Sequence, residues 1–125
     1  MIAGIYNMLC EQGTDFTRSV VLKYPDILND PTGATYLPFN LSNYTARMQV
    51  RRNVEASTVD IELTTANSGI ALETNQTGEI VLTMTNSQTA ALTDSGVYDL
   101  EIISNTGIVS RVIQGTFTLD LEVTH

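Results

Sequence analysis

Residues 94–102 read DSGVYDLEI, a turn that leads directly into an alternating segment. In an extended chain Tyr98, Leu100 and Ile102 share one face, and acidic side chains occupy the other. The spacing also suits a corner in which the Tyr98 hydroxyl hydrogen-bonds to backbone a few residues upstream, although a turn before an ordinary strand tyrosine fits equally well. Either interpretation predicts a β-strand with one buried and one solvated face.

The same alternation recurs along the chain and predicts further strands. In residues 44–52 (YTARMQVRR), apolar side chains at even positions alternate with Thr45, Arg47, Gln49 and Arg51. The other expected strands lie in residues 15–24 (DFTRSVVLKY), 58–65 (TVDIELTT), 68–74 (SGIALET), 77–84 (TGEIVLTM), 97–103 (VYDLEII) and 108–124 (IVSRVIQGTFTLDLEVT).

Three kinds of break separate these strands. Asn-Gln-Thr-Gly at 75–78 and Ser-Asn-Thr-Gly at 104–107 predict hairpin turns, with Gly78 available for a positive φ. Residues 85–92 (TNSQTAAL) predict one or two turns of helix that begin with a capping box from Thr85 to Gln88. Gly115 interrupts the last segment and predicts a bulge or bend.

These elements predict an all-β fold: an immunoglobulin-like (Ig-like) antiparallel β-sandwich with about eight strands and one short helical turn. A single domain over residues 1–125 is expected, with an N-terminal strand or arm at 1–12 and a long proline-rich loop at 25–43. DSGVYDLEI resembles the end of an immunoglobulin domain, with Leu100 in the place of the half-cystine. The chain has no tryptophan and one cysteine, so it is Ig-like at most.

Composition argues against most chemistry. The net charge of -8 opposes the phosphate neutralisation that nucleic-acid binding requires. Cys10 has no partner cysteine, and the single histidine is His125, so thiol catalysis, zinc and a hydroxyl nucleophile with a histidine base lack their residues. Acidic i, i+2 pairs such as Asp99 and Glu101 predict solvated strand faces. Calcium between Asp26 and Asp30 is a minor alternative. We therefore expect no enzyme, cofactor or metal site.

The N-terminal residues lack the features of a signal peptide, and no apolar run reaches the length of a membrane span. We therefore expect a protein made in the cytosol, with neither nucleic acid nor membrane as its partner.

Five short motifs carry a second resemblance. They are a Tyr-Thr-Ala-x-x-Gln-Val strand at Tyr44–Val50, a Gly-x-Ile hairpin at Gly78–Leu82, a Thr-x-x-Gln-Thr-x-x-Leu turn at Thr85–Leu92, a Tyr-Asp-Leu-Glu strand at Tyr98–Glu101 and a Gly-x-Phe-Thr-Leu strand at Gly115–Leu119. Over about residues 16–124 the chain resembles small tailed-bacteriophage virion proteins and the Ig-like N-terminal domain of phage baseplate upper proteins.

The resemblance implies a non-enzymatic structural protein of a tailed-bacteriophage virion, synthesised in the bacterial host cytoplasm. It would act as a tail or baseplate assembly module, or a fibre-attachment module, with other virion proteins as partners and as a homo-oligomer in the particle. A capsid decoration or neck protein is one alternative. A carbohydrate-binding β-sandwich for host adhesion is another, with Tyr36, Phe39 and Tyr44 as its aromatic candidates.

Candidate subunit contacts come from three places. The N-terminal segment has two semi-apolar faces, which favours pairing with another chain, although an ordinary first strand also fits. The proline-rich loop contributes aromatic side chains, for which anchoring in the core or the loop is favoured over an exposed platform. The arginines near residue 50 either face solvent or receive an acidic protein surface. The candidates are Ile5, Tyr6, Met8, Leu9, Tyr36, Phe39, Arg47, Arg51 and Arg52.

Overall fold

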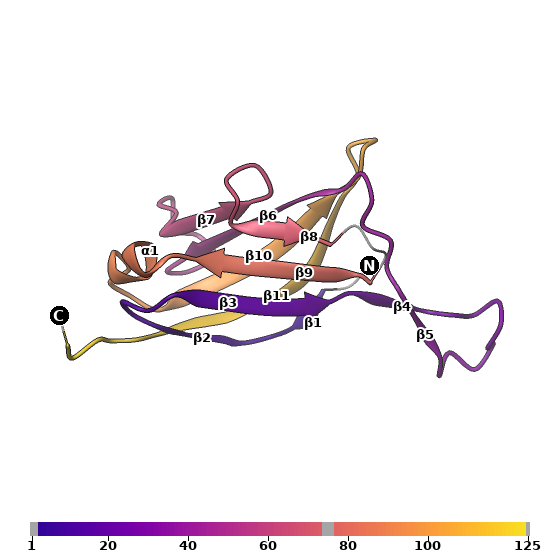
Figure 1. Cartoon of the computed structure of the whole chain (residues 1–125), viewed down its shortest axis with the longest axis horizontal. Coiled ribbons are helices and arrows are strands. Elements are labelled where there is room, and N and C mark those ends of the chain that lie inside the picture. The colour runs from indigo at the N-terminus through magenta and orange to yellow at the C-terminus, as the bar shows by residue number, and fades with distance from the viewer. Residues whose placement is uncertain (1–2, 74–76, 125) are drawn as a thin grey trace.

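The structure, a computed structural model, describes residues 3–73 and 77–124. Two β-sheets pack face to face, and a two-stranded ribbon projects beyond one end of them (Figure 1). In the larger sheet the strand order is β1 (Gly4–Ile5) with β2 (Met8–Glu11), then β11 (Val109–Asp120), β10 (Gly96–Ile103), β6 (Thr45–Arg51) and β7 (Ile61–Thr64). The smaller sheet has the order β3 (Phe16–Val21), β9 (Glu79–Met84), β8 (Ile70–Leu72).

This strand order is that of an Ig-like sandwich, so the predicted fold class is confirmed. In the immunoglobulin scheme β3, β9 and β8 take the positions of strands B, E and D, while β6, β7, β10 and β11 take those of C, C′, F and G. The first residues pair in parallel with the last strand through β1 and β2, and the other pairings are antiparallel.

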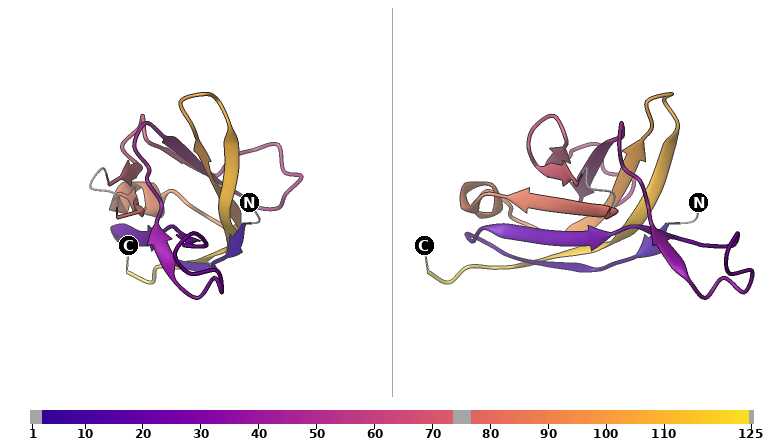
Figure 2. Two further views of the ribbon diagram at one scale, coloured as in Figure 1. Left: turned by 90° about the vertical axis from the view of Figure 1, so that its right-hand side faces the viewer. Right: turned by 45° about the vertical axis from the view of Figure 1, so that its right-hand side comes forward.

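The core lies between the two sheets, which Figure 2 shows from two further sides. Alternate residues of β6, β9 and β10 point into it, as the period-two pattern predicts. Leu100, in the half-cystine position, is fully buried, so aliphatic packing occupies the place of a disulfide. The largest fully buried side chains include Met48, Leu63, Ile80, Leu82, Met84, Leu100, Ile102 and Phe117.

The local predictions near the helix and turns are confirmed. Helix α1 (Asn86–Ala90) has Thr85 as its N-cap, and Gln88 completes the capping box. Gly78 has a φ of 73° and Gly107 a φ of 89°, as tight turns require. The Asn75 and Gln76 part of the first predicted turn lies outside the described residues.

Two predictions for the last strand need correction. The register shift falls opposite Leu100 and Glu101, where Val112 is the extra residue, and not at Gly115. The strand ends at Asp120, so the alternation that continues in the sequence does not extend it; Leu121 is exposed. Gly115 instead marks a close backbone approach, described below.

The predicted loop over residues 25–43 has no helix or strand over most of its length, but it also contains strand pairing that the sequence did not predict. Its first part forms a hairpin in which β4 (Lys23–Pro25) pairs with β5 (Tyr36–Pro38). Proline lacks an N–H group, so a two-stranded ribbon with open edges tolerates Pro25 and Pro38 where a central strand would not. We call residues 23–38 the hairpin arm. It extends away from the sandwich at the end opposite the C-terminus (Figures 1 and 2).

Candidate functional site

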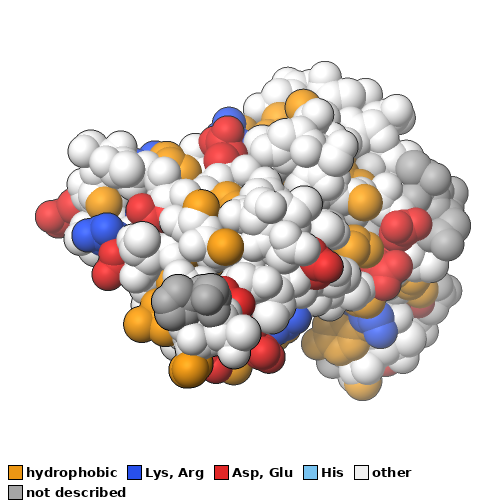
Figure 3. Space-filling view, turned by 60° about the vertical axis from the view of Figure 1, so that its left-hand side comes forward, with side chains coloured by type: hydrophobic (Ala, Val, Ile, Leu, Met, Phe, Trp, Pro, Cys, Tyr) orange, Lys and Arg blue, Asp and Glu red, His pale blue; other side chains and the backbone are white. Residues whose placement is uncertain are grey.

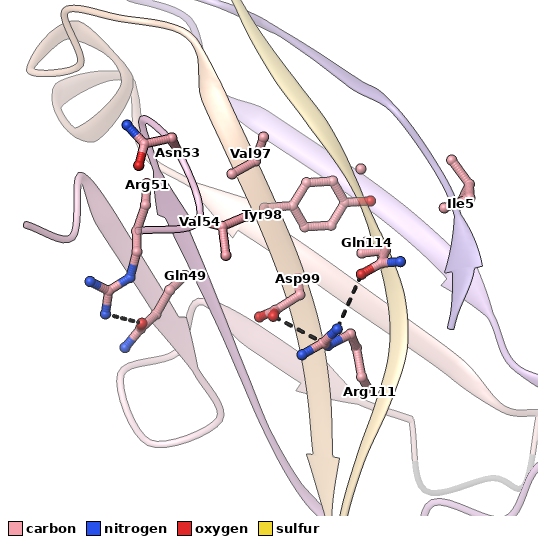
Figure 4. A pocket seen from close by; sticks show the side chains of 11 residues that line it. Ile5, Gln49, Arg51, Asn53, Val54, Val97, Tyr98, Asp99, Arg111 and Gln114 are labelled. Carbon is pink, nitrogen blue, oxygen red and sulfur yellow. Dashed lines mark hydrogen bonds and ion pairs between the residues drawn. The ribbon is translucent and has the colours of Figure 1, made fainter. Parts of the chain in front are cut away.

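The outer face of the larger sheet contains a cavity of about 410 Å³. Strands β6, β10 and β11 form its floor, β1 lies on one side, and the loop after β6 lies on the other (Figure 4). Its volume is in the range of about 300–1,000 Å³ that is usual for binding pockets. The lining residues are Ile5, Gln49, Arg51, Asn53, Val54, Val97, Tyr98, Asp99, Arg111, Gln114 and Gly115.

Two arginines line this cavity, and hydrogen bonds hold both. Arg51 donates to the Gln49 side-chain oxygen at 2.8 Å and to the Ala56 carbonyl at 2.7 Å. Arg111 pairs with the Asp99 carboxylate at 3.4 Å and donates to the Gln114 side-chain oxygen at 3.3 Å. The guanidinium groups are therefore positioned before any partner arrives, and two positive charges stand beside one carboxylate.

The rim of the cavity carries two exposed aliphatic side chains. Val54 is 86% exposed in the loop after β6, and Ile5 is 72% exposed on β1. Figure 4 shows them on opposite sides of the floor strands. Apolar side chains in water gain free energy when a partner covers them, so the rim favours binding of a partly apolar protein surface.

Tyr98 ties the N-terminal segment to the sheet. Its hydroxyl donates to the Tyr6 carbonyl, 92 residues away in sequence, and not to backbone just upstream. The predicted hydrogen bond of a tyrosine corner is therefore wrong in its acceptor, which is the Tyr6 carbonyl and not a backbone group just upstream of Tyr98. Burial raises the pKa of the Tyr98 hydroxyl, with a smaller contribution from Tyr6, so the group stays a neutral donor.

Gly115 explains why this contact forms. It lies opposite Tyr98 in the ladder, and a Cβ there would stand 2.4 Å from the Tyr6 carbonyl oxygen. The missing side chain lets the N-terminal segment approach β11 closely between its two stretches of pairing with that strand, where the Asn7 side-chain oxygen accepts from the Thr116 amide at 3.0 Å. The cavity wall at Ile5 depends on this close approach.

The N-terminal candidate contacts separate into two groups. Ile5, Tyr6 and Leu9 are exposed, whereas Met8 is 2% exposed and belongs to the core. Met8 is therefore corrected from a candidate contact to a packing residue. Parallel pairing of β1 and β2 with β11 makes the segment the first strand of its own sandwich, and one edge of it faces outward.

Arg18 covers part of that edge. Its guanidinium donates to the Leu9 carbonyl at 2.7 Å and lies 4.5 Å from the centre of the Phe16 ring. It thereby connects the neighbouring edges of the two sheets and occupies an acceptor that an added strand would use.

The remaining arginine candidates are exposed and paired with acidic side chains of the same chain. Arg47 pairs with Glu101 at 2.7 Å, and Arg52 pairs with Asp94 at 2.7 Å; both arginines are exposed. Acidic side chains are spread over the face of the molecule in Figure 3, in keeping with the net charge of -8. The arginines are thus mostly compensated by neighbours within the chain.

The aromatic candidates do not form a flat platform. The Phe39 ring packs edge-on against Tyr24, at 6.3 Å, and against Tyr44, at 5.5 Å, and so anchors the base of the hairpin arm. Tyr36 is exposed on β5. Stacking on a sugar ring needs open aromatic faces, which this edge-on packing at Phe39 disfavours.

The carboxylates and the thiol considered as possible reactive or metal-binding groups have structural roles. Asp26 accepts hydrogen bonds from Asn29, and Asp30 accepts from Thr32 and Thr35. Cys10 is buried, and burial raises the pKa of its thiol. Within residues 3–73 and 77–124, no three His, Cys, Asp or Glu side chains gather as metal ligands. No helix in the described part of the chain has the length and apolar character to cross a membrane.

Sequence reasoning proposed Ile5 and Arg51 of the cavity lining as contacts but not Val54 or Arg111. Val54 could have been noticed as a lone aliphatic residue in the polar stretch RRNVEAS. Arg111 gave no signal, because its place on the cavity floor depends on the register between β10 and β11.

Comparison with known proteins finds no matching family model and no matching curated protein. Solved structures with a similar backbone are Ig domains. They include Dpr1 IG1 bound to DIP-eta IG1, with 13% identity, a TM-score of 0.46, and coverage of 94% of this chain and 91% of that chain. The N-terminal four Ig domains of Dscam1 isoform 4.44 show 15% identity and a TM-score of 0.43, over 98% of this chain and 24% of that chain.

Extracellular domains 3–5 of Drosophila OTK show 12% identity and a TM-score of 0.39, over 98% of this chain and 34% of that chain. The chain thus spans about a quarter to a third of these two multidomain structures. At such identities the fold assignment rests on the strand order described above.

Proposed function

We propose that this protein is a non-enzymatic structural subunit of a tailed-bacteriophage virion, located in the tail or baseplate, where it binds protein neighbours. The phage assignment rests on the motif resemblance at Tyr44–Val50, Thr85–Leu92 and Gly115–Leu119. The observation that carries the binding role is the cavity on the outer face of the larger sheet, with exposed Val54 and Ile5 at its rim.

The chemistry of the cavity supports protein binding over catalysis. Its ionised groups are paired with one another or with amides, so each is already satisfied. A general acid or base needs a group held ready for a substrate proton, and a nucleophile needs a neighbouring base. A rim of aliphatic side chains around fixed guanidinium groups instead matches the apolar and arginine-rich character of protein interfaces.

The assignment to a virion is tested by finding the protein in particles. Mass spectrometry of phage particles purified from the source culture is expected to detect the chain in a fixed ratio to the major tail proteins. Antibody labelling in the electron microscope is expected at the tail or baseplate. Labelling over the head or at the neck would favour a capsid decoration or neck protein, and absence from all particles would contradict the proposal.

The role of the cavity is tested by a matched pair of variants. Val54→Asp places a charge on the rim, and Ile108→Asp places the same charge on an exposed aliphatic residue of the β10–β11 turn. Incorporation into particles is expected to fall for Val54→Asp alone. Equal incorporation of both variants would show that the cavity does not bind a neighbouring protein in the particle. Retention on a glycan array, lost in Tyr36→Ala, would instead support host adhesion.

A further inference from the structure

The hairpin arm presents aliphatic side chains at its tip with no partner in the core of the described chain. Leu28 is 97% exposed and Ile27 is 62% exposed. Neither belongs to the hydrophobic core cluster, and the arm extends past the end of both sheets (Figure 1). Apolar side chains that adjoin on a projecting element gain free energy when a partner covers them.

The tip keeps its shape through its own hydrogen bonds. The Asp26 amide donates to the Thr35 carbonyl at 2.8 Å, and the Asp30 amide donates to the Asp26 carbonyl at 2.8 Å. The Asp30 carboxylate accepts from the Thr35 amide at 2.9 Å and from the Thr32 hydroxyl at 2.5 Å. An element that is ordered before binding loses less conformational entropy when it docks, so the hydrogen bonds of the arm tip favour docking.

The base of the arm is fixed to the sandwich. The Phe39 amide donates to the Leu22 carbonyl at 2.9 Å, the Leu22 amide donates to the Gly78 carbonyl at 2.8 Å, and the Phe39 ring packs against Tyr24. The arm therefore has one direction relative to the sheets, which a repeated contact between subunits requires.

Charge and shape match the tip to the cavity on the outer face of the larger sheet. Between Tyr24 and Leu37 the arm has two carboxylates, Asp26 and Asp30, and no basic side chain. The cavity has two guanidinium groups beside one carboxylate, in a chain whose net charge is -8. Its aliphatic rim and volume of about 410 Å³ suit small aliphatic side chains.

The arm cannot reach the cavity of its own chain. Its base lies next to the start of β6, whereas Arg51 in the cavity floor ends that strand. Six residues of extended chain separate the two ends by about 20 Å, and the arm points away from the sheets (Figure 2). A second copy of the chain has no such restriction.

From this geometry we infer that the tip of the hairpin arm, with Leu28 and Ile27 at its centre, docks in the outer-face cavity of a second copy. The inference rests on the proposed function, because it names the self-contact that such a structural subunit would use. The contact joins different surfaces on the two copies, so it gives either a two-fold dimer in which each arm enters the other copy's cavity, or a ring or filament that continues from subunit to subunit.

Cysteine cross-linking tests the contact directly. Leu28→Cys and Val54→Cys are prepared as separate proteins, mixed and oxidised. A cross-linked heterodimer is expected only in the mixture, and Cys10 stays unreactive because it is buried with a raised thiol pKa. Ile108→Cys replaces Val54→Cys as the control and is expected to give no such product. If Leu28→Cys alone forms cross-linked homodimers in the same yield as the Leu28→Cys and Val54→Cys heterodimer, the tips contact each other and the inference is overturned.

Sedimentation equilibrium gives the second readout. Leu28→Lys places a positive charge against the guanidinium groups of the cavity and is expected to weaken self-association of the full chain by at least about tenfold, while Ile108→Lys leaves it unchanged. Circular dichroism confirms that both variants are folded. A chain that stays monomeric up to about 1 mM, or equal association of both variants, would overturn the inference. The virion proposal would survive either result if the chain is still found in purified particles.

Discussion

The outer-face cavity and the hairpin arm both expose aliphatic side chains, but the structure around these side chains differs between the two regions. In the cavity, Val54 and Ile5 lie beside two arginines and one carboxylate whose hydrogen bonds and ion pair are already made, on a sheet whose other face is packed into the core. At the arm tip, Leu28 stands on a ribbon with no core beneath it, held only by local hydrogen bonds. The comparison indicates that a concave binding surface is supported by a packed sheet, whereas a projecting element such as the arm tip needs only its own hydrogen bonds to keep its shape.

The largest expected effect separates the core under the sheet from the arm. Leu100→Ala is expected to lower the free energy of unfolding by about 2–5 kcal/mol, because Leu100 is fully buried in the half-cystine position. Leu28→Ala is expected to change it by less than about 0.5 kcal/mol. Urea unfolding monitored by circular dichroism measures both. A comparable loss for Leu28→Ala would show that the arm packs on the sandwich.

The next effect concerns the wall of the cavity. Gly115→Ala is expected to cost about 1–3 kcal/mol, because the new Cβ would overlap the Tyr6 carbonyl oxygen. The control is Gly4→Ala, where the nearest atom to a new Cβ lies at 3.8 Å. Hydrogen exchange is expected to show faster exchange in residues 4–11 for Gly115→Ala alone. Similar exchange in both variants would contradict the close approach of the Tyr6 backbone to Gly115.

Tyr98→Phe removes the hydroxyl that holds the same segment. The Tyr6 carbonyl then loses a donor, and the expected cost is about 1–3 kcal/mol near neutral pH. Burial raises the pKa of Tyr98 above its ordinary value of 10.0, so the unfolded chain releases a proton that the folded chain retains. The contribution of Tyr98 to the free energy of unfolding is therefore complete below pH 10 and decreases as the pH rises above 10.

Thermal unfolding of both proteins across this pH range checks the assignment. The difference in stability between wild type and Tyr98→Phe is expected to shrink above pH 10, because phenylalanine does not titrate. A difference that is constant with pH would mean that Tyr98 ionises equally easily in the folded and unfolded chains.

The smallest effect is expected from an ion pair on the outer face of the larger sheet, next to the cavity but outside its lining. A double-mutant cycle on Arg47 and Glu101, with each residue replaced by alanine, is expected to give a coupling of less than about 1 kcal/mol, since the pair is substantially exposed. The coupling is expected to decrease further in high salt. A value above 2 kcal/mol would show that this face is far less hydrated than its exposure indicates.

Local sequence was sufficient for most of the elements. The alternation in residues 44–52 and 97–103 predicted β6 and β10, and Thr85 with Gln88 predicted the start of the helix. These signals are local because a strand's period and a cap's hydrogen bonds involve residues within a few positions. The hairpin arm was missed because its prolines indicated a loop, and an open two-stranded ribbon accepts them.

Sequence therefore determined the all-β class, the inward face of each main strand and the absence of a disulfide pair. Tertiary structure decided the partner of Tyr98, the role of Gly115, the burial of Met8 and the meeting of Ile5, Val54 and Arg111 around one cavity. Each of these depends on contacts between residues far apart in the chain. Such contacts follow from strand order and register, which period-two alternation alone does not specify.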